Sequence, residues 1–333
     1  MNFLSSSVLF FGLLAISDGL PANAGSRPAV HRQTAKHHLK ILGGEEAALG
    51  DFPYQASIQL YLGWQFGWRH VCGGVILNEN LILTTGSCTI GRLDEQLPEK
   101  ASPRRGVCPN QQRPTVEVGF ITLSEGDDEP TMQQLLIDEI IIHPDFAYNV
   151  LTGQVRNDIA IFSLNGTFDL SGEAASPIAL PPAGVTLDVS SKCVASGWGT
   201  EEFGIIEEPS NELLYIHMDL FEDDYCENLY DTTWDLYVPG EMLCAGLAEG
   251  GGGTCTGDRG GPLVCKGDDG NAYLFGLTSF FDSTCGAESG HPEVFTEVPP
   301  YVAWIQEVMA QYQTPKARKA QLKAQLKAAL KSN

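Results

Sequence analysis

Short apolar runs are the feature of this chain that most constrains its fold. Between residue 41 and about residue 296 they alternate with clusters of glycine, proline and aspartate. The clearest runs are residues 55–61, 74–77, 81–84, 137–142, 159–164, 213–218 and 273–279. Many short strands bounded by turn residues are typical of β-barrels and β-sandwiches. Before the C-terminal tail, a helical pattern is found only in residues 300–311, so the sequence predicts an all-β domain with one C-terminal helix.

The segments on either side of this domain differ from it in composition. Residues 1–24 resemble a signal peptide, because the apolar run 8–16 is too short to span a bilayer and small residues precede position 25. Residues 25–40 are polar and basic, contain no cysteine and are predicted to form a short pro-segment.

Residues 312–333 form a basic tail, in which leucines recur every four residues. This spacing predicts an amphipathic helix with a narrow apolar stripe. Two interpretations stay open: a solvated helix that folds back on the acidic body, or a helix that binds a partner or a membrane surface.

Charge and cysteine content narrow the class of protein. The net charge is −22, so a nucleic-acid partner, which requires a basic surface, is excluded. Nine cysteines are typical of an oxidising compartment, and together with the signal peptide they predict a secreted, extracellular protein. Asn165 begins an N-x-T triplet and is a candidate glycosylation site. The acidic runs 125–129 and 222–224 lack an ordered ligand spacing, so we predict no metal site and no cofactor.

Seven short motifs occur in a characteristic order along the domain. They are ILGG (41–44), CGG (72–74), LTTGSC (83–88), NDIA (157–160), SGWG (196–199), CAG (244–246) and GDRGGP (257–262). Together they resemble the landmarks of a chymotrypsin/trypsin-like serine protease domain over residues 41–311. The resemblance implies two six-stranded antiparallel β-barrels followed by a C-terminal helix.

The same resemblance locates the catalytic triad of the family. In that mechanism a serine attacks the substrate carbonyl, a histidine takes the serine proton, and an aspartate orients the histidine. Here the aspartate corresponds to Asp158, but Ser87 stands at the histidine position and Arg259 at the serine position. A hydroxyl does not act as a general base near neutral pH, and a guanidinium is not a nucleophile. The triad is therefore expected to be degenerate and the protein not to be an enzyme.

The residues that line the substrate pocket in relatives are also changed. Gly253 stands where trypsin-like relatives have an acid, so no specificity for basic residues is expected. Ser279 begins the strand that resembles the substrate-pairing strand, and Phe281 and Glu293 replace glycines of the pocket mouth and wall. We therefore expect the pocket to be closed to side chains. We also expect Arg259 to form an ion pair with Asp158 or Glu293 that plugs the former cleft.

The resemblance also implies an activation switch. Cleavage after Lys40 would free the amino group of Ile41, which would then form an ion pair with Asp258.

The expected disulfides are also those of the family. The implied pairs are Cys72–Cys88, Cys193–Cys265, Cys226–Cys244 and Cys255–Cys285. Cys108 is left over, within the long segment 91–114; it is either a capped or buried thiol or the site of a disulfide-linked dimer.

Three function classes follow. The favoured class is a secreted, non-catalytic protease homologue that binds another extracellular protein, such as a protease, a zymogen or an inhibitor; family members of this kind act in extracellular cascades, including innate immunity in arthropods. The second is a secreted structural or assembly protein, favoured by the basic tail and the odd cysteine. The third is an endopeptidase with a rearranged site, which would need a nucleophile that the sequence does not reveal.

Overall fold

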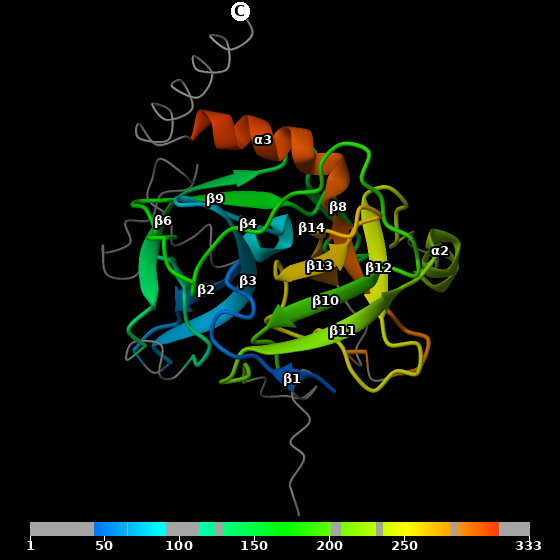
Figure 1. Cartoon of the computed structure of the whole chain (residues 1–333), viewed down its shortest axis with the longest axis horizontal. Helices are drawn as coiled ribbons and strands as arrows, with labels where there is room; N and C mark the ends of the chain where they lie inside the picture. Colours follow the sequence, from blue (N-terminus) through cyan, green and yellow to red (C-terminus); the bar gives the residue numbers. More distant parts are fainter. Residues whose placement is uncertain are drawn as a thin grey trace, which may run out of the picture. The chain divides into compact units, whose positions relative to one another are not determined.

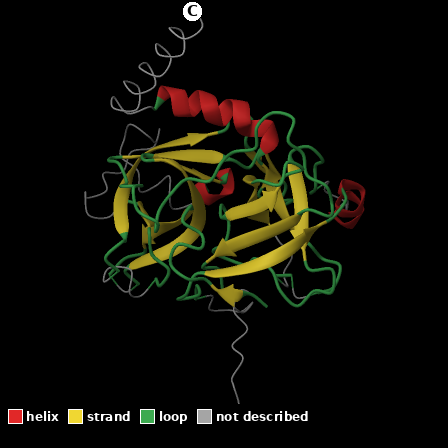
Figure 2. Ribbon diagram, viewed as in Figure 1, coloured by secondary structure: helices red, strands yellow, loops and turns green. Residues whose placement is uncertain are grey.

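The computed structural model describes residues 43–64, 66–90, 113–123, 129–200, 208–230, 236–280, 285–286 and 288–312. These residues belong to one compact unit. The signal peptide, the pro-segment, Lys40, Ile41, Cys108, Phe281 and nearly all of the basic tail lie outside the described residues. Strands dominate the described part, as Figure 2 shows.

The first barrel is a closed, antiparallel sheet of six strands in the order β2-β3-β4-β9-β6-β5 (Figure 1). Its strands are β2 (Gln55–Tyr61), β3 (Trp68–Asn78), β4 (Leu81–Thr84), β5 (Thr115–Val118), β6 (Gln133–Ile142) and β9 (Ala160–Leu164). Strand β2 shows how the sequence builds it: Ala56, Ile58 and Leu60 alternate along the strand and belong to the barrel core. Its other residues face away from that core.

The second barrel contains the strands β10 (Lys192–Gly197), β11 (Leu214–Leu220), β12 (Met242–Gly246), β13 (Pro262–Lys266), β14 (Ala272–Phe280) and β15 (Glu293–Glu297). They form the order β11-β10-β13-β14-β15-β12, and pairing of β11 with β12 closes the barrel. The two-residue strand β1 (Glu45–Glu46) adds to the outer edge of β11. A separate two-stranded ribbon joins β7 (Ala147–Tyr148) and β8 (Val155–Arg156). The prediction of two six-stranded barrels is confirmed.

The C-terminal helix is also confirmed, with small changes at its start. A 3₁₀ turn, η3 (Pro299–Tyr301), leads into α3 (Val302–Gln311). In Figure 1 this helix lies beside β9 of the first barrel. Ile305 and Val308 pack in a cluster with Leu83 of β4 and Leu277 of β14, so the helix helps to hold the two barrels together.

The prediction of a single helix before the tail was wrong. A 3₁₀ turn, η1 (Gly86–Thr89), follows β4, and a helix, α2 (Asp223–Tyr230), follows β11. Asp223 and Asp224 of the acidic run 222–224 lie in the first turn of α2, where carboxylates interact favourably with the helix dipole. In the described part of the chain, no helix is long and apolar enough to cross a membrane.

Candidate functional site

The centre of the candidate site is the buried carboxylate of Asp158, which lies two residues before the start of β9. Its side chain is 2% exposed. The backbone N–H of Ser87 donates a hydrogen bond of 2.6 Å to Oδ1, and the hydroxyl of Ser87 donates one of 2.9 Å to Oδ2. The hydroxyl of Ser279, at the end of β14, donates a third bond of 2.6 Å to Oδ2. Residues from both barrels therefore meet at one carboxylate.

Of the two partners predicted for Arg259, Asp158 does not form the ion pair, and the Glu293 alternative stays a prediction. No Lys, Arg or His nitrogen of the described residues lies within 4.0 Å of the Asp158 carboxylate. Burial raises the pKa of Asp158, while the hydrogen bonds from Ser279 and Ser87 and the nearby charge of Arg259 lower it. The physical reason for the wrong prediction is that the two serines already satisfy the carboxylate.

Removing the Ser279 hydroxyl should destabilise the protein measurably. Ser279→Ala removes one of the hydrogen bonds to the buried carboxylate of Asp158. A hydrogen bond to a charged group contributes about 1.5–3 kcal/mol. We expect a loss of about 2 kcal/mol in the free energy of unfolding, measured by urea denaturation near pH 7. Ser289→Ala, which removes a hydroxyl at an exposed position, is the control and should change little. Equal effects of the two substitutions would contradict this role of Ser279.

Arg259, at the position that the resemblance assigns to the nucleophile, is held in place by its backbone. Its carbonyl oxygen accepts a hydrogen bond of 2.7 Å from the N–H of Gly73 and lies 3.4 Å from the Sγ atom of Cys88. The next residue, Gly260, adopts a φ of 77°, and an added Cβ would overlap the Thr84 hydroxyl. The turn therefore requires glycine, and it fixes the point from which the Arg259 side chain projects.

Asp258 is the second buried carboxylate, with 1% of its surface exposed. Its Oδ1 accepts a hydrogen bond of 2.8 Å from the N–H of Gly199, and its Oδ2 accepts one of 2.9 Å from the N–H of Cys255. Burial raises the pKa of Asp258 to about 6, despite these two bonds. The predicted partner, Ile41, lies outside the described residues, so the ion pair of the activation switch stays a prediction.

A third buried carboxylate, that of Glu293, lies beside Gly253, and the resemblance assigns both positions to the substrate pocket. A Cβ built on Gly253 would overlap its Oε1 atom, and the side chain is 1% exposed. Glu293, in β15, thus brings an acid to the place where Gly253 lacks one. The absence of an acid at position 253 therefore does not mean that no acid lies there, because Glu293 supplies one from another strand. The closed pocket stays a prediction because Phe281 lies outside the described residues.

A buried polar chain on the outer face of β2 was not anticipated. Ser57 and the Nδ1 atom of His70 share a hydrogen bond of 2.9 Å, and His70 Nε2 lies 3.0 Å from the carbonyl oxygen of Gly257. Gln59 Nε2 lies 3.5 Å from the Ser57 hydroxyl and also donates to Glu117. Burial lowers the pKa of His70 to about 4. Since Gly257 precedes Asp258, this chain supports the loop that carries Arg259.

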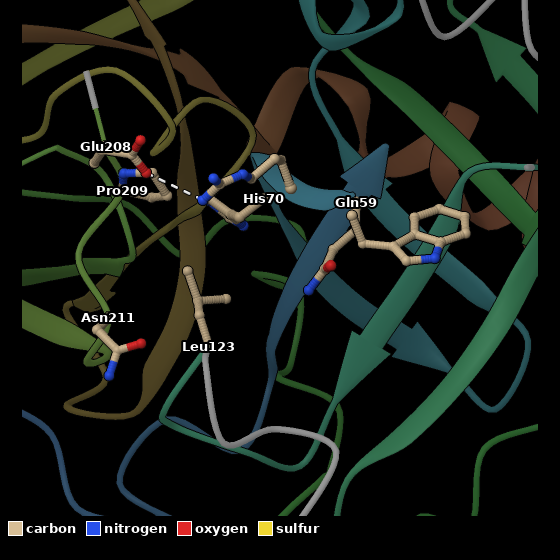
Figure 3. A pocket seen from close by; sticks show the side chains of 8 residues that line it. Gln59, His70, Leu123, Glu208, Pro209 and Asn211 are labelled. Carbon is tan, nitrogen blue, oxygen red and sulfur yellow. Dashed lines mark hydrogen bonds and ion pairs between the residues drawn. The ribbon is translucent and has the colours of Figure 1, made fainter. Parts of the chain in front are cut away.

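Two cavities include residues of this polar chain or Arg259. One, of about 360 Å³, is lined by Gln59, Trp68, Arg69, His70, Leu123, Glu208, Pro209 and Asn211. Figure 3 shows its labelled side chains, with a dashed line at Glu208 marking the 3.1 Å ion pair that Glu208 makes with Arg69. The other, of about 370 Å³, is lined by Leu60, Leu62, Val71, Cys72, Ser87, Cys88, Ile90 and Arg259.

The four disulfides that the resemblance implies are present. They are Cys72–Cys88, Cys193–Cys265, Cys226–Cys244 and Cys255–Cys285. They fit an extracellular protein. Asn165 is exposed just after β9, as a glycosylation acceptor must be. Within the described ranges, no group of three or more His, Cys, Asp or Glu residues is arranged to hold a metal ion.

Two closed six-stranded barrels, which contain four disulfides and meet at a buried aspartate, define the chymotrypsin-like fold. The family model described as Trypsin matches residues 41–305. The chain is 35% identical to Trypsin-1 of Astacus astacus over 269 residues, covering 80% of this chain and 98% of the relative. It is 31% identical to Kallikrein 1-related peptidase b22 of Mus musculus over 277 residues, covering 82% and 90%. The chain belongs to the trypsin family.

Proposed function

We propose that this chain is a secreted, non-catalytic member of the trypsin family that acts by binding another extracellular protein of a protease pathway. One observation carries the proposal. Asp158, which would orient a catalytic histidine, instead accepts hydrogen bonds from Ser87 and Ser279, and the nucleophile position holds Arg259. Neither Ser87 nor Arg259 takes up a proton near neutral pH, so a proton transfer of the triad type has no base.

The proposed partner is a protease, a zymogen or an inhibitor of the same pathway. We further propose that cleavage after Lys40 acts as a switch, since Asp258 is retained and buried. In relatives such a switch completes a catalytic site. Here it would shape a binding surface, because the loop of Asp258 also carries Arg259.

A fluorophosphonate probe tests the loss of catalysis. We expect no labelling of the chain, whether intact or cleaved after Lys40. The double variant Ser87→His, Arg259→Ser restores a histidine beside Asp158 and a hydroxyl in the nucleophile turn, and it should gain labelling once cleaved. The matched control is Ser87→His, Arg259→Ala, which has the base but no nucleophile and should stay unlabelled.

Labelling of the unmodified chain would overturn the proposal and revive the endopeptidase alternative. Far-UV circular dichroism of each variant would verify that the fold is retained.

A further inference from the structure

We propose that the protein forms a two-fold symmetric dimer in which each copy inserts Trp64 into a cavity of the other. We call residues 61–68, at the β2–β3 turn, the aromatic hairpin. The hairpin cavity is the cavity of about 360 Å³ in Figure 3, which lies at the base of this hairpin because Trp68 and Arg69 line it. The dimer does not depend on the proposed function, since the triad positions take no part in it.

The aromatic hairpin presents large apolar side chains to solvent. Trp64 is 85% exposed and Phe66 is 58% exposed. Residues 61–68 include four aromatic residues and no charged residue. An exposed apolar cluster marks an interaction surface, and tryptophan is among the residues that contribute most to binding at protein interfaces. Trp64 is therefore the anchor of this surface.

The turn holds Trp64 in a fixed position. The N–H of Leu62 donates a hydrogen bond of 2.9 Å to the carbonyl oxygen of Gly67. The N–H groups of Phe66 and Gly67 donate bonds of 3.1 and 2.8 Å to the carbonyl oxygen of Gly63. Gly63 and Gly67 have φ angles of 95° and 64°, which glycine adopts without strain. Because the turn is already ordered, little conformational entropy is lost when it binds.

The hairpin cavity fits an indole ring. Its volume of about 360 Å³ lies within the roughly 300–1,000 Å³ of pockets that bury small-molecule ligands. Trp68, Leu123 and Pro209 contribute apolar surface to its wall, and Glu208 contributes a carboxylate. An indole combines an apolar ring with one N–H donor, which needs an acceptor when it is buried. A carboxylate accepts several hydrogen bonds, so Glu208 has the capacity to accept one from an indole in addition to its contact with Arg69.

Arg69 ties the aromatic hairpin to the wall of the hairpin cavity. Its Nε atom donates a hydrogen bond of 3.1 Å to the carbonyl oxygen of Phe66, and its Nη1 atom forms a 3.1 Å ion pair with Glu208. The projecting ring and the cavity therefore belong to one surface patch. Within one copy Trp64 stays exposed, so it does not fill the cavity beside it. A patch that carries both a projecting ring and a cavity for such a ring is self-complementary, as a two-fold interface requires.

The charge of the chain determines how salt acts on this dimer. Two copies repel each other, since each has a net charge of −22. The aromatic hairpin is uncharged, so its insertion does not depend on the pairing of opposite charges. Salt screens the repulsion, and the dimer should therefore strengthen as the salt concentration rises. A contact between the basic tail of one copy and the acidic body of the other would instead weaken.

Sedimentation velocity over a hundredfold range of protein concentration tests the dimer. We expect a monomer–dimer equilibrium that shifts toward the dimer as the NaCl concentration rises. Trp64→Ala should raise the dissociation constant by about thirtyfold or more, as truncation of a tryptophan anchor does at other interfaces. Leu151→Ala, which shortens a 94% exposed side chain of the β7–β8 turn, is the matched control and should stay within twofold.

A mixture of two variants tests the reciprocal insertion. Trp64→Ala keeps the hairpin cavity but lacks the ring that fills it. Asn211→Phe, at an exposed position of the cavity wall, obstructs the cavity but keeps Trp64. Neither variant alone should dimerise where the unmodified protein does, whereas an equimolar mixture should form a heterodimer through one Trp64 contact. A fluorophore on one variant detects this heterodimer, and the restored association shows that both variants are folded.

Each of four results would overturn the inference. A chain that stays monomeric at every concentration has a hairpin with another kind of partner, such as a different protein or a lipid surface. A dimer that Trp64→Ala leaves unchanged, or that the mixture does not restore, has another interface. A dimer that weakens with salt is held by the basic tail. A dimer that resists dilution but dissociates on reduction is held by Cys108.

Discussion

Replacing Gly253 by alanine is expected to lower the free energy of unfolding by about 3 kcal/mol, because overpacking a buried site forces its neighbours out of their favoured positions. The added Cβ would overlap the Oε1 atom of Glu293 and would lie 3.1 Å from the carbonyl oxygen of Cys285. The Glu293 side chain has little room to withdraw, since it is 1% exposed. Urea denaturation under non-reducing conditions measures the effect.

The same substitution in the Glu293→Ala variant identifies the cause of this loss of stability. In Glu293→Ala, the carboxylate is absent, so Gly253→Ala should cost about 2 kcal/mol less than in the unmodified protein. Gly172→Ala is the control for glycine replacement as such, because a Cβ there would meet no atom within 4 Å. If Gly253→Ala costs the same in both backgrounds, Glu293 does not fill the space beside Gly253.

The sequence motifs predicted which residues form the site better than they predicted which of these residues contact each other. The short motifs placed Ser87 and Asp158 correctly beside each other, because both follow from the barrel architecture that the motifs identify. Of the two acids predicted to pair with Arg259, Asp158 was the wrong one, because its carboxylate is satisfied by uncharged hydroxyl groups. The hydroxyl that satisfies the carboxylate belongs to Ser279, which is 121 positions away and carries no charge to suggest it.

The sequence also did not predict that the second face of β2 is buried. Gln55, Ser57 and Gln59 alternate with apolar residues, a pattern that predicts a solvent-facing side. In the structure all three are buried. Ser57 and Gln59 join the polar chain that includes His70 and Glu117, while Gln55 accepts a hydrogen bond of 2.7 Å from Ser196 of the second barrel. Alternation specifies which residues share a face, but the packing of the two barrels decides whether that face meets water.

Two buried groups, His70 and Asp258, should give the protein's stability opposite dependences on pH. The pKa of His70 falls from 6.5 to about 4, so between these values the unfolded chain binds more protons and stability is lost as the pH falls. The pKa of Asp258 rises from 3.8 to about 6, so in that window the folded chain binds more protons and stability is lost as the pH rises. Each effect amounts to about 3 kcal/mol, since one pKa unit corresponds to about 1.4 kcal/mol.

Single substitutions separate the two effects. Relative to the unmodified protein, His70→Gln should gain about 3 kcal/mol as the pH falls from 6.5 to 4, because it lacks the group whose protonation opposes folding. Asp258→Asn should show the reverse trend and gain about 3 kcal/mol relative to the unmodified protein as the pH rises from 3.8 to 6. His217→Gln, at an exposed position of β11, is the control and should follow the unmodified protein. Urea denaturation at half-unit pH intervals measures each difference.

The same measurement on protein cleaved after Lys40 tests the proposed switch. An ammonium group of Ile41 placed against Asp258 would favour the ionised carboxylate and lower its pKa. The stability lost between pH 3.8 and 6 should then be regained in the cleaved protein, while the effect of His70 stays unchanged. If the cleaved and intact proteins keep the same pH dependence, the new amino group does not reach Asp258. Cleavage would then leave the loop that carries Arg259 as it is.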